Sequence, residues 1–399
     1  MPSVLFVDDE PMVLEGLKRM LRPFRREWKA EFCGGAKEAL SLLSTERFDV
    51  LVTDMRMPEM DGLELLTQVN ELYPEMVRVV LSGQADEDVS LKTAGLAHQY
   101  LSKPCDWETL QSTLERACSM GSLLTAPGLK NLVSKMGTLP SLPGVYVKLM
   151  EELNSPNTSI QRVAEIMSQD MGMAAKALQL VNSAFFGLRF QVSSLQHAIT
   201  VLGLKTMRAL VLSVQVFSQF RSRGLPGFSA EALMNHCISV GSMSRMIVDK
   251  EGRRKDLSDD ALLAGLLHDA GQLILADRMS DKYVEAMRVA KQKGVTLWEA
   301  EREVIGATHA QVGAYLMGLW GLPQAITEAI LYHHNPRECP NRKFSVLTAV
   351  HAADALDHAL NAMMAGQRLP MVDSEYMAQM GLDDRFGAWE EACRAAGPK

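Results

Sequence analysis

Side chains that could take part in phosphoryl transfer stand at the ends of short apolar runs in the first part of the chain. They are three carboxylates, a hydroxyl and an ammonium group: Asp8, Asp9, Asp54, Ser82 and Lys103. Carboxylates held close together cannot all stay ionised cheaply, and a hard divalent ion such as Mg2+ relieves their repulsion. Beside such an ion, the hydroxyl and the ammonium group would stabilise phosphoryl oxygens while one carboxylate attacks in line.

The apolar runs predict the sheet that would bring these groups together. Five runs alternate with five amphipathic stretches, which indicates parallel strands connected by helices. We expect strands at Val4–Val7, Ala30–Cys33, Val50–Thr53, Val77–Leu81 and Gln99–Leu101. We expect helices at Pro11–Leu21, Ala36–Leu43, Asp61–Leu72, Glu87–Ala94 and Trp107–Ala117. The prediction is an α/β doubly wound five-stranded parallel sheet, in which ligands bind at the carboxyl ends of the strands.

Short motifs at those strand ends carry a resemblance to a known family. They are Val7-Asp8-Asp9-Glu10, Thr53-Asp54-Met55-Arg56-Met57-Pro58, Asp61-Gly62, Leu81-Ser82-Gly83 and Lys103-Pro104. Together they make residues 1–120 resemble the flavodoxin-like receiver domain of two-component response regulators.

The resemblance to receiver domains implies a role for each polar residue. Asp54 would be the phosphoacceptor, and Ser82 and Lys103 would assist the transfer. Ser82 and Tyr100 would form the switch pair of a hydroxyl and an aromatic ring. The family's Mg2+ ion would be held by four groups, namely Asp8 (through water), Asp9, Asp54 and the backbone carbonyl of Arg56.

The alternation of strands and helices ends near residue 120. Residues 121–128, which include Thr125-Ala126-Pro127-Gly128, are predicted to be a linker. From residue 129 to residue 365 the helical period dominates, so we predict an all-α domain there. Residues 366–399 are predicted to be a weakly helical C-terminal tail.

Histidines and aspartates stand out in the helical half. They are His236, His268, Asp269, His309, His333, His334 and Asp354. The pair His268-Asp269 lies within an apolar stretch, so both side chains are expected to be buried, and a buried carboxylate or imidazole needs a partner. Such residues on separate helices can form a metal site in the core of a bundle. Neutral imidazole and carboxylate ligands suit Zn, Fe or Mn.

These residues resemble the ligands of the HD superfamily of metal-dependent phosphohydrolases. His236, the pair His268-Asp269 and Asp354 take the places of its defining ligands. The other three histidines match the additional ligands of the two-metal HD-GYP phosphodiesterases, which cleave cyclic di-GMP: His309, His333 and His334.

A closer resemblance is to the HDOD domain, an HD-related output domain. It covers about residues 129–335 and is carried by Leu139-Pro140-Ser141-Leu142-Pro143, Ala164–Asp170, Leu180–Gly187, Ser194–Ile199 and Leu202-Gly203. The resemblance implies a non-catalytic signalling or scaffolding module. Two departures from the catalytic pattern agree with that implication. Gln272 replaces the family lysine, and Asn335-Pro336-Arg337-Glu338 stands where the Gly-Tyr-Pro signature would follow His334.

Composition limits the remaining functions. The chain has 399 residues and a net charge of −7, which argues against a broad basic surface for nucleic acid. No apolar stretch is long enough to span a bilayer and the N-terminus does not resemble a signal peptide, so we expect a cytoplasmic protein without membrane contact. A DNA-binding regulator is disfavoured because no basic recognition helix is evident.

Two functions remain after this comparison. The first is a response regulator of a two-component phosphorelay, in which phosphorylation of Asp54 by a sensor histidine kinase controls a non-catalytic HDOD output with an unknown downstream protein partner. The alternative is a metal-dependent phosphohydrolase or cyclic di-GMP phosphodiesterase regulated by the receiver. The sequence leaves open a homodimer, the sign of the regulation and whether the helical half holds metal.

Overall fold

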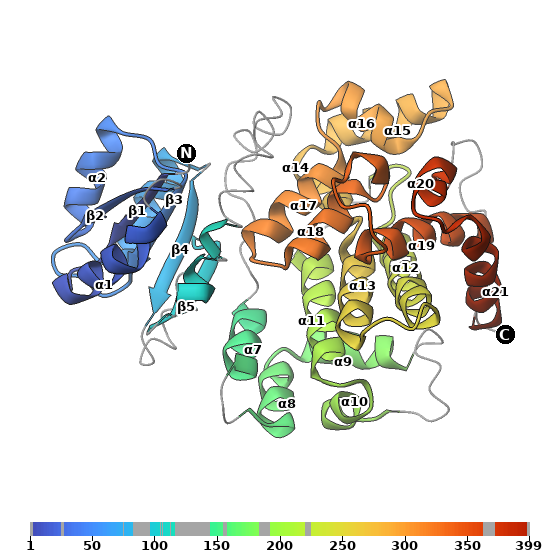
Figure 1. Cartoon of the computed structure of the whole chain (residues 1–399), viewed down its shortest axis with the longest axis horizontal. Coiled ribbons are helices and arrows are strands. Elements are labelled where there is room, and N and C mark those ends of the chain that lie inside the picture. The colour runs from blue at the N-terminus through green and yellow to red at the C-terminus, as the bar shows by residue number, and fades with distance from the viewer. Residues whose placement is uncertain are drawn as a thin grey trace. The chain divides into compact units, whose positions relative to one another are not determined.

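The chain folds into two compact units, of which the first contains a sheet and the second is helical (Figure 1). The computed structural model describes residues 3–24, 28–74, 76–82, 96–103, 105, 107–111, 113–115, 144–154, 158–182, 192–219, 225–361 and 372–396. The predicted linker at 121–128 lies outside the described residues. Within the described part, no helix is both long and apolar enough to cross a membrane.

The first unit is built on a five-stranded parallel sheet in the order β2-β1-β3-β4-β5. Its strands are β1 (Ser3–Val7), β2 (Lys29–Cys33), β3 (Val50–Asp54), β4 (Val77–Ser82) and β5 (Gln99–Ser102). β3 lies in the middle and is buried along its whole length. The doubly wound parallel sheet predicted from the alternating runs is therefore confirmed.

The helices of the first unit also follow the predicted order. They are α1 (Pro11–Leu21), α2 (Ala36–Thr45) and α3 (Gly62–Leu72), and residues 107–111 and 113–115 are helical. The helix expected at Glu87–Ala94 lies outside the described residues. A Cβ added at Gly62 would lie only 2.8 Å from the Cα of Met55, so only glycine lets α3 begin this close to the end of β3.

Every regular element that the structure describes in the second unit is a helix, as predicted. Its main helices are α7 (Gly144–Asn154), α8 (Ile160–Ser168), α9 (Met171–Val181), α10 (Leu195–Leu202), α11 (Leu204–Gln219), α12 (Ala230–Lys250), α13 (Lys255–Leu267), α14 (Ala270–Arg278), α15 (Ser280–Lys293), α16 (Leu297–Val304), α17 (His309–Leu319), α18 (Gln324–Tyr332) and α19 (Val346–Asn361). α13 is the central helix, because it packs against α11, α12, α18 and α19. Every residue of its apolar run, from Ala261 to Leu267, is buried, as expected for a helix segment that is apolar on all faces.

Two close approaches between glycine backbones and neighbouring helices fix the position of α13 and α14. A Cβ at Gly265 would lie 2.6 Å from the Cα of Gly241, so α12 and α13 touch along their backbones. A Cβ at Gly271 would lie 2.7 Å from the carbonyl carbon of His309, so α14 begins directly against the start of α17. The segment between these glycines contains the His268-Asp269 pair.

The C-terminal segment adds α20 (Ser374–Gln379) and α21 (Phe386–Ala396) to the helical unit. α21 packs against α12. The indole of Trp389 donates a 2.9 Å hydrogen bond to Glu251, and Arg385 donates two more to the same carboxylate, at 3.0 and 2.9 Å. The helical character predicted for residues 366–399 agrees with these two helices. The domain boundary near residue 365 stays a prediction.

Candidate phosphoacceptor site and metal centre

Lys103 joins two carboxylates at the carboxyl edge of the sheet. Its Nζ lies 2.7 Å from Asp8 Oδ2 and 2.6 Å from Asp54 Oδ1. Asp8 and Asp54 are 1% and 7% exposed, so both charges are held largely away from water. Burial alone would lower the pKa of Lys103, but its hydrogen bonds to Asp54 and Asp8 raise it, which keeps the ammonium group charged.

The sheet register explains this meeting. β1 and β3 are parallel neighbours with Val7 opposite Thr53, so the residue after Val7 and the residue after Thr53 lie at the same edge. Asp8 Oδ1 accepts a hydrogen bond from the backbone of Glu10, at 3.0 Å. Asp54 Oδ2 accepts one from the backbone N–H of Arg56, at 2.9 Å. Each aspartate therefore has one oxygen on a backbone donor and one facing Lys103.

The donor set at this edge fits a hard divalent cation. Asp9 is partly exposed next to the buried Asp8, and Asp54 is the last residue of β3. Three carboxylates and one ammonium group leave two negative charges, and carboxylate oxygens are the ligands that Mg2+ prefers. The predicted switch pair falls at Ser82 in β4 and Tyr100 in β5, and their side chains lie outside the described part of the structure.

The helical unit brings all seven predicted histidines and aspartates into one cluster. They come from five places in the sequence: His236 from α12, His268 and Asp269 from the junction of α13 and α14, His309 from the start of α17, His333 and His334 from the end of α18, and Asp354 from α19. They fall into two groups, and within each group the ligand atoms lie within 4.8 Å of one another. The first group is Asp269, His309, His333 and His334, and the second is His236, His268 and Asp354. Two groups of this kind fit two metal ions.

Asp269 lies between the two groups. Its Oδ1 is 3.0 Å from His309 Nε2 in the first group, and its Oδ2 is 3.5 Å from His268 Nε2 in the second. The side chain of Gln272, which replaces the family lysine, donates a 2.7 Å hydrogen bond to the same Oδ2. The phenol of Tyr283 in turn donates to Gln272 at 2.9 Å. The neutral amide of Gln272 therefore donates to Asp269 at the position where the family pattern has a lysine.

Two histidines are fixed by the helices that they end. The Nδ1 of His268 lies 2.7 Å from the carbonyl oxygen of Gly265, three residues earlier. The Nδ1 of His333 makes the same contact with Ile330, also at 2.7 Å. A carbonyl can only accept, so each Nδ1 carries the proton and each Nε2 offers its lone pair to the cluster. Helix geometry thus sets the tautomer that a metal ligand requires.

Buried atoms without partners indicate where cations fit. His333 Nε2 and His334 Nδ1 make no hydrogen bond among the described residues. The carboxylate oxygens nearest to them in the cluster are 3.6 Å away, on Asp269, and 3.9 Å away, on Asp354, which is beyond hydrogen-bond distance. Buried polar atoms are almost always satisfied, so orphaned imidazole nitrogens facing carboxylates fit a metal site.

The electrostatics of the cluster are dominated by its carboxylates. Burial opposes protonation of His309, yet Glu301 and Asp269 raise its pKa to about 10. In the same way, Asp354 and Asp357 outweigh burial and raise the pKa of His236 to about 10. Without a metal ion, protons on these imidazoles offset the carboxylate charge.

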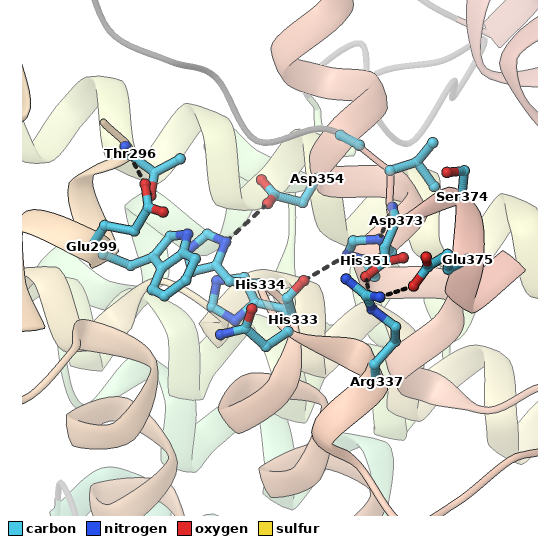
Figure 2. Close-up of a pocket in the computed structure, with 14 residues that line it drawn as sticks. Thr296, Glu299, His333, His334, Arg337, His351, Asp354, Asp373, Ser374 and Glu375 are labelled. Atoms are coloured by element: carbon cyan, nitrogen blue, oxygen red, sulfur yellow. Dashed lines mark hydrogen bonds and ion pairs between the residues drawn. The ribbon is translucent and has the colours of Figure 1, made fainter. Parts of the chain in front are cut away.

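A pocket of about 420 Å3 adjoins this cluster (Figure 2). It is lined by Thr296, Trp298, Glu299, His333, His334, Asn335, Arg337, His351, Asp354, Ala355, Val372, Asp373, Ser374 and Glu375. Arg337 pairs with Asp373 at 2.7 Å and with Glu375, on the side of the pocket away from His334 in Figure 2. The single arginine of the described lining is therefore already paired with two carboxylates.

His351 connects the pocket wall to a predicted ligand. Its Nδ1 lies 2.6 Å from the carbonyl oxygen of His333, and its Nε2 accepts a 2.8 Å hydrogen bond from the backbone of Asp373. It is buried, at 4% exposure, and both of its ring nitrogens are engaged by backbone groups. The segment that carries Asp373, a partner of Arg337, is thus hydrogen-bonded through His351 to the segment that carries His333.

Three cluster residues were not predicted from the sequence. Asp357 lies 2.7 Å from His236 Nδ1, Glu301 lies 2.7 Å from His309 Nδ1, and His358 Nε2 lies 3.3 Å from Asp354. Asp357 and His358 follow Asp354 by three and four residues, so the helical period carried a signal for both. Glu301 belongs to the amphipathic α16, whose pattern reads as a surface helix, and no spacing marks it.

Comparisons with known proteins agree with this division. A model of the response regulator receiver domain matches residues 4–115, and a model of the HDOD domain matches residues 139–336. The hydrogenase transcriptional regulatory protein HoxA of Bradyrhizobium diazoefficiens is 35% identical over 121 residues, which are 30% of this chain and 24% of HoxA.

Two further similar proteins match a larger share of the chain. An uncharacterized protein of Treponema pallidum is 21% identical over 240 residues, which are 60% of this chain and 46% of that protein. The chain thus spans less than half the length of these curated relatives. A solved HDOD domain protein of unknown function from Geobacter sulfurreducens has a TM-score of 0.55 and 22% identity, and the match covers 68% of this chain and 92% of that one. With its receiver domain and its HDOD domain in this order, the chain belongs to the two-component response regulators that carry an HDOD output.

Proposed function

We propose that Asp54 accepts a phosphoryl group from a sensor histidine kinase and that this phosphorylation controls the HDOD domain. The observation that carries the proposal is the contact of Lys103 with both Asp8 and Asp54, at 2.7 and 2.6 Å. Mg2+ bound by Asp9, Asp54 and the carbonyl of Arg56, with Asp8 behind a water molecule, would supply the charge that a phosphoryl group needs on approach. In this arrangement an Asp54 oxygen attacks phosphorus while the bond to the donor histidine breaks.

Lys103 has a second task after the transfer. Phosphorylation turns the Asp54 carboxylate into an acyl phosphate, which removes the carboxylate charge that Lys103 faces at 2.6 Å. The ammonium group then pairs with a phosphoryl oxygen instead, as in other sites of phosphoryl transfer. The resulting shift at β4 and β5, with Ser82 and Tyr100 as the proposed switch pair, would be transmitted to the HDOD domain. A change from mostly inactive to mostly active needs about 5.5 kcal/mol of differential stabilisation.

Phosphorylation with a small donor tests the receiver proposal. Protein is incubated with acetyl phosphate and Mg2+ and the covalent product is measured by intact mass. We expect one phosphoryl group on wild type, none on Asp54→Asn and normal labelling of Glu59→Gln, which removes an exposed carboxylate paired with Lys37 in the same unit. Labelling that persists unchanged in Asp54→Asn would overturn the assignment.

The output itself is proposed to be a non-catalytic binding module with a protein partner. Gln272 supplies no cation beside Asp269, and Arg337 is engaged by Asp373 and Glu375. A phosphodiester bound here would therefore meet neither the family lysine nor the loop with the Gly-Tyr-Pro signature that the catalytic relatives have. Capture of proteins by the full chain with and without beryllofluoride, read by mass spectrometry, tests this output. Identical sets of captured proteins in both states would contradict control by phosphorylation.

A second candidate function is a metal-dependent phosphohydrolase that acts on a cyclic dinucleotide such as cyclic di-GMP. It is favoured by the two ligand groups that meet at Asp269 beside a pocket of about 420 Å3. Fe, Mn or Zn held by the seven ligands would supply an activated water. The protein's own residues would orient that water and the phosphodiester within the pocket.

Metal analysis followed by an activity assay tests the second candidate. Protein purified with and without oxygen is analysed for Fe, Mn and Zn, and cyclic di-GMP hydrolysis is measured with added Mn2+ or Fe2+. Turnover that disappears in His268→Asn supports the candidate. Metal-loaded protein that releases no product would exclude it for this substrate and leave the binding output.

A further inference from the structure

We propose that Glu301 and Asp357 are positioning residues, each of which orients one histidine toward one of two divalent ions. This inference rests on the metal centre described for the second candidate function and goes beyond it, because neither residue belongs to the predicted ligand set. One carboxylate stands behind each ligand group: Glu301 behind the group of His309, and Asp357 behind the group of His236.

Glu301 fixes His309 at two points. Its Oε2 accepts a 2.8 Å hydrogen bond from the backbone N–H of His309 and lies 2.7 Å from its Nδ1. The residue is 0% exposed, so this carboxylate has been taken fully out of water. A carboxylate on Nδ1 leaves Nε2 as the ligand atom, and Nε2 is the atom that lies 3.0 Å from Asp269.

Asp357 repeats the arrangement at the other group. Its Oδ2 lies 2.7 Å from Nδ1 of His236, and its Oδ1 accepts a hydrogen bond from the hydroxyl of Ser239. His236 Nε2 then faces the second group, 3.3 Å from Asp354 Oδ1 and 3.2 Å from His268 Nε2. Asp357 is 3% exposed, so it too is a buried charge committed to one imidazole.

The two groups therefore share one design. Each has one histidine held by a buried carboxylate, His309 or His236, and one held by the carbonyl three residues earlier in its helix, His333 or His268. A carboxylate behind a metal-bound histidine raises the basicity of the ligand and fixes its ring, whereas a carbonyl fixes the ring alone. Each proposed ion thus receives one strengthened imidazole and at least one ordinary one, and His334 adds a third imidazole to the group of His309.

Charge gives an independent reason for two ions. Four carboxylates lie in or directly behind the ligand set: Asp269, Asp354, Glu301 and Asp357. Two divalent cations carry the equal and opposite charge. Gln272 matters here, because a lysine at its place beside Asp269 would add a positive charge and reduce what a second ion can neutralise. Buried charge is stable only when it is balanced.

Amide substitutions separate positioning from a purely structural role. Glu301→Gln and Asp357→Asn keep an oxygen that accepts from Nδ1 but remove the charge, so the fold keeps its hydrogen bonds. Metal-free full-length protein is titrated with Mn2+, and the bound ions are counted by elemental analysis. We expect two ions per chain for wild type and a loss of about 10–100-fold in affinity for one ion in each variant, with both ions weakened in the double variant.

Two matched controls and one spectroscopic measurement sharpen the test. Glu303→Gln removes an exposed carboxylate from α16, the helix of Glu301, and should bind as wild type. Ser239→Ala keeps Asp357 but removes one of its hydrogen bonds, and a smaller loss is expected. The electron paramagnetic resonance spectrum should change from that of two coupled Mn2+ ions to that of an isolated ion in each single variant.

The possible outcomes distinguish a failure of this inference from a failure of the proposed metal centre. Wild type that binds no ion overturns the metal centre and the inference together. Wild type with two ions and single variants with unchanged affinity overturn the inference alone. Loss of both ions in either single variant also overturns it, because a general structural role would weaken both groups at once.

Discussion

The carboxylate of Asp269 and the imidazole of His309 meet 3.0 Å apart at the point where α14 begins against α17. This contact depends on Gly271, whose added Cβ would lie 2.7 Å from the carbonyl carbon of His309. Backbone cannot move aside as a flexible side chain does. The distance between two predicted ligands is therefore set by a glycine that carries no chemistry itself.

Gly271→Ala should destabilise the helical unit and weaken metal binding together. Overpacking of this kind costs about 1–3 kcal/mol, and separation of α14 from α17 would pull Asp269 away from His309. Urea unfolding and Mn2+ titration measure the two effects. Gly387→Ala in α21 is the control, because a Cβ there meets nothing within 4 Å. Equal stability of the two variants would contradict the role given to Gly271.

Lys103→Met should lower the stability of the receiver unit through charge repulsion. Without the ammonium group, Asp8 and Asp54 face each other as unneutralised buried carboxylates, and a cost of about 2 kcal/mol is expected for the lost charged hydrogen bonds. The same substitution in an Asp54→Asn background should cost less, since one of the two charges is gone. Urea denaturation in EDTA gives the double-mutant cycle, and additive effects would show that the two residues do not interact.

Metal binding should release protons and strengthen as pH rises. The pKa values of His236 and His309 are raised to about 10, so both imidazoles are protonated at neutral pH and must lose a proton to bind an ion through Nε2. Calorimetric Mn2+ titration in buffers of different ionisation enthalpy measures that release. A heat of binding that is independent of the buffer would contradict it.

The same raised pKa values set the stability of the metal-free protein. A group whose pKa is higher in the folded than in the unfolded protein stabilises the fold while it is protonated. For His236 and His309 this contribution is complete below the unfolded pKa of histidine, about 6.5, and is lost as pH rises through the folded pKa of about 10. Metal-free protein should therefore lose stability between these limits. Metal-loaded protein should keep its stability over this range, because the ions take the place of the protons on His236 and His309. Thermal unfolding with EDTA or with Mn2+ across this range is the measurement, and parallel profiles would contradict the prediction.

Glu251→Gln should loosen α21 from α12. Burial opposes ionisation of Glu251, but the hydrogen bonds from Arg385 and Trp389 lower its pKa. A lowered pKa adds stability above the unfolded value of about 4.3, and that stability is lost as pH falls through the folded pKa. The difference between variant and wild type should thus vanish in acid. Trp389 fluorescence reports the contact, and Glu390→Gln, which removes a partly exposed partner of Arg394, is the control.

Much of the architecture follows from local sequence pattern. Strands β1 to β5 were predicted because short apolar runs alternate with amphipathic helices, and the observed bounds differ from the predicted ones by one residue. The all-helical second half was predicted because the helical period dominates from residue 129 onward. Both patterns are local, so a single sequence is enough to read them.

That the seven ligands cluster could be predicted only from their residue types and from the resemblance to the HD superfamily. His268-Asp269 stands out in an apolar helix, and His333-His334 ends another, so both pairs can be recognised from the sequence alone. Glu301 is different. Its helix α16 has the pattern of a surface helix, yet the residue is 0% exposed and accepts from His309, eight residues away. Only the packing of α16 reveals that a carboxylate supports the cluster.

The sequence by itself determined the two kinds of fold, the carboxylates and lysine at the strand ends, and the histidines and aspartates that face one another. Residue type and local period carry that information. The tertiary structure alone decided that Lys103 joins Asp8 to Asp54, that Asp269 lies between two ligand groups, and that Glu301 and Asp357 stand behind one histidine each. The physical reason is that charge balance and hydrogen bonding act over a few ångströms in space, between residues that the chain separates by as many as 121 positions.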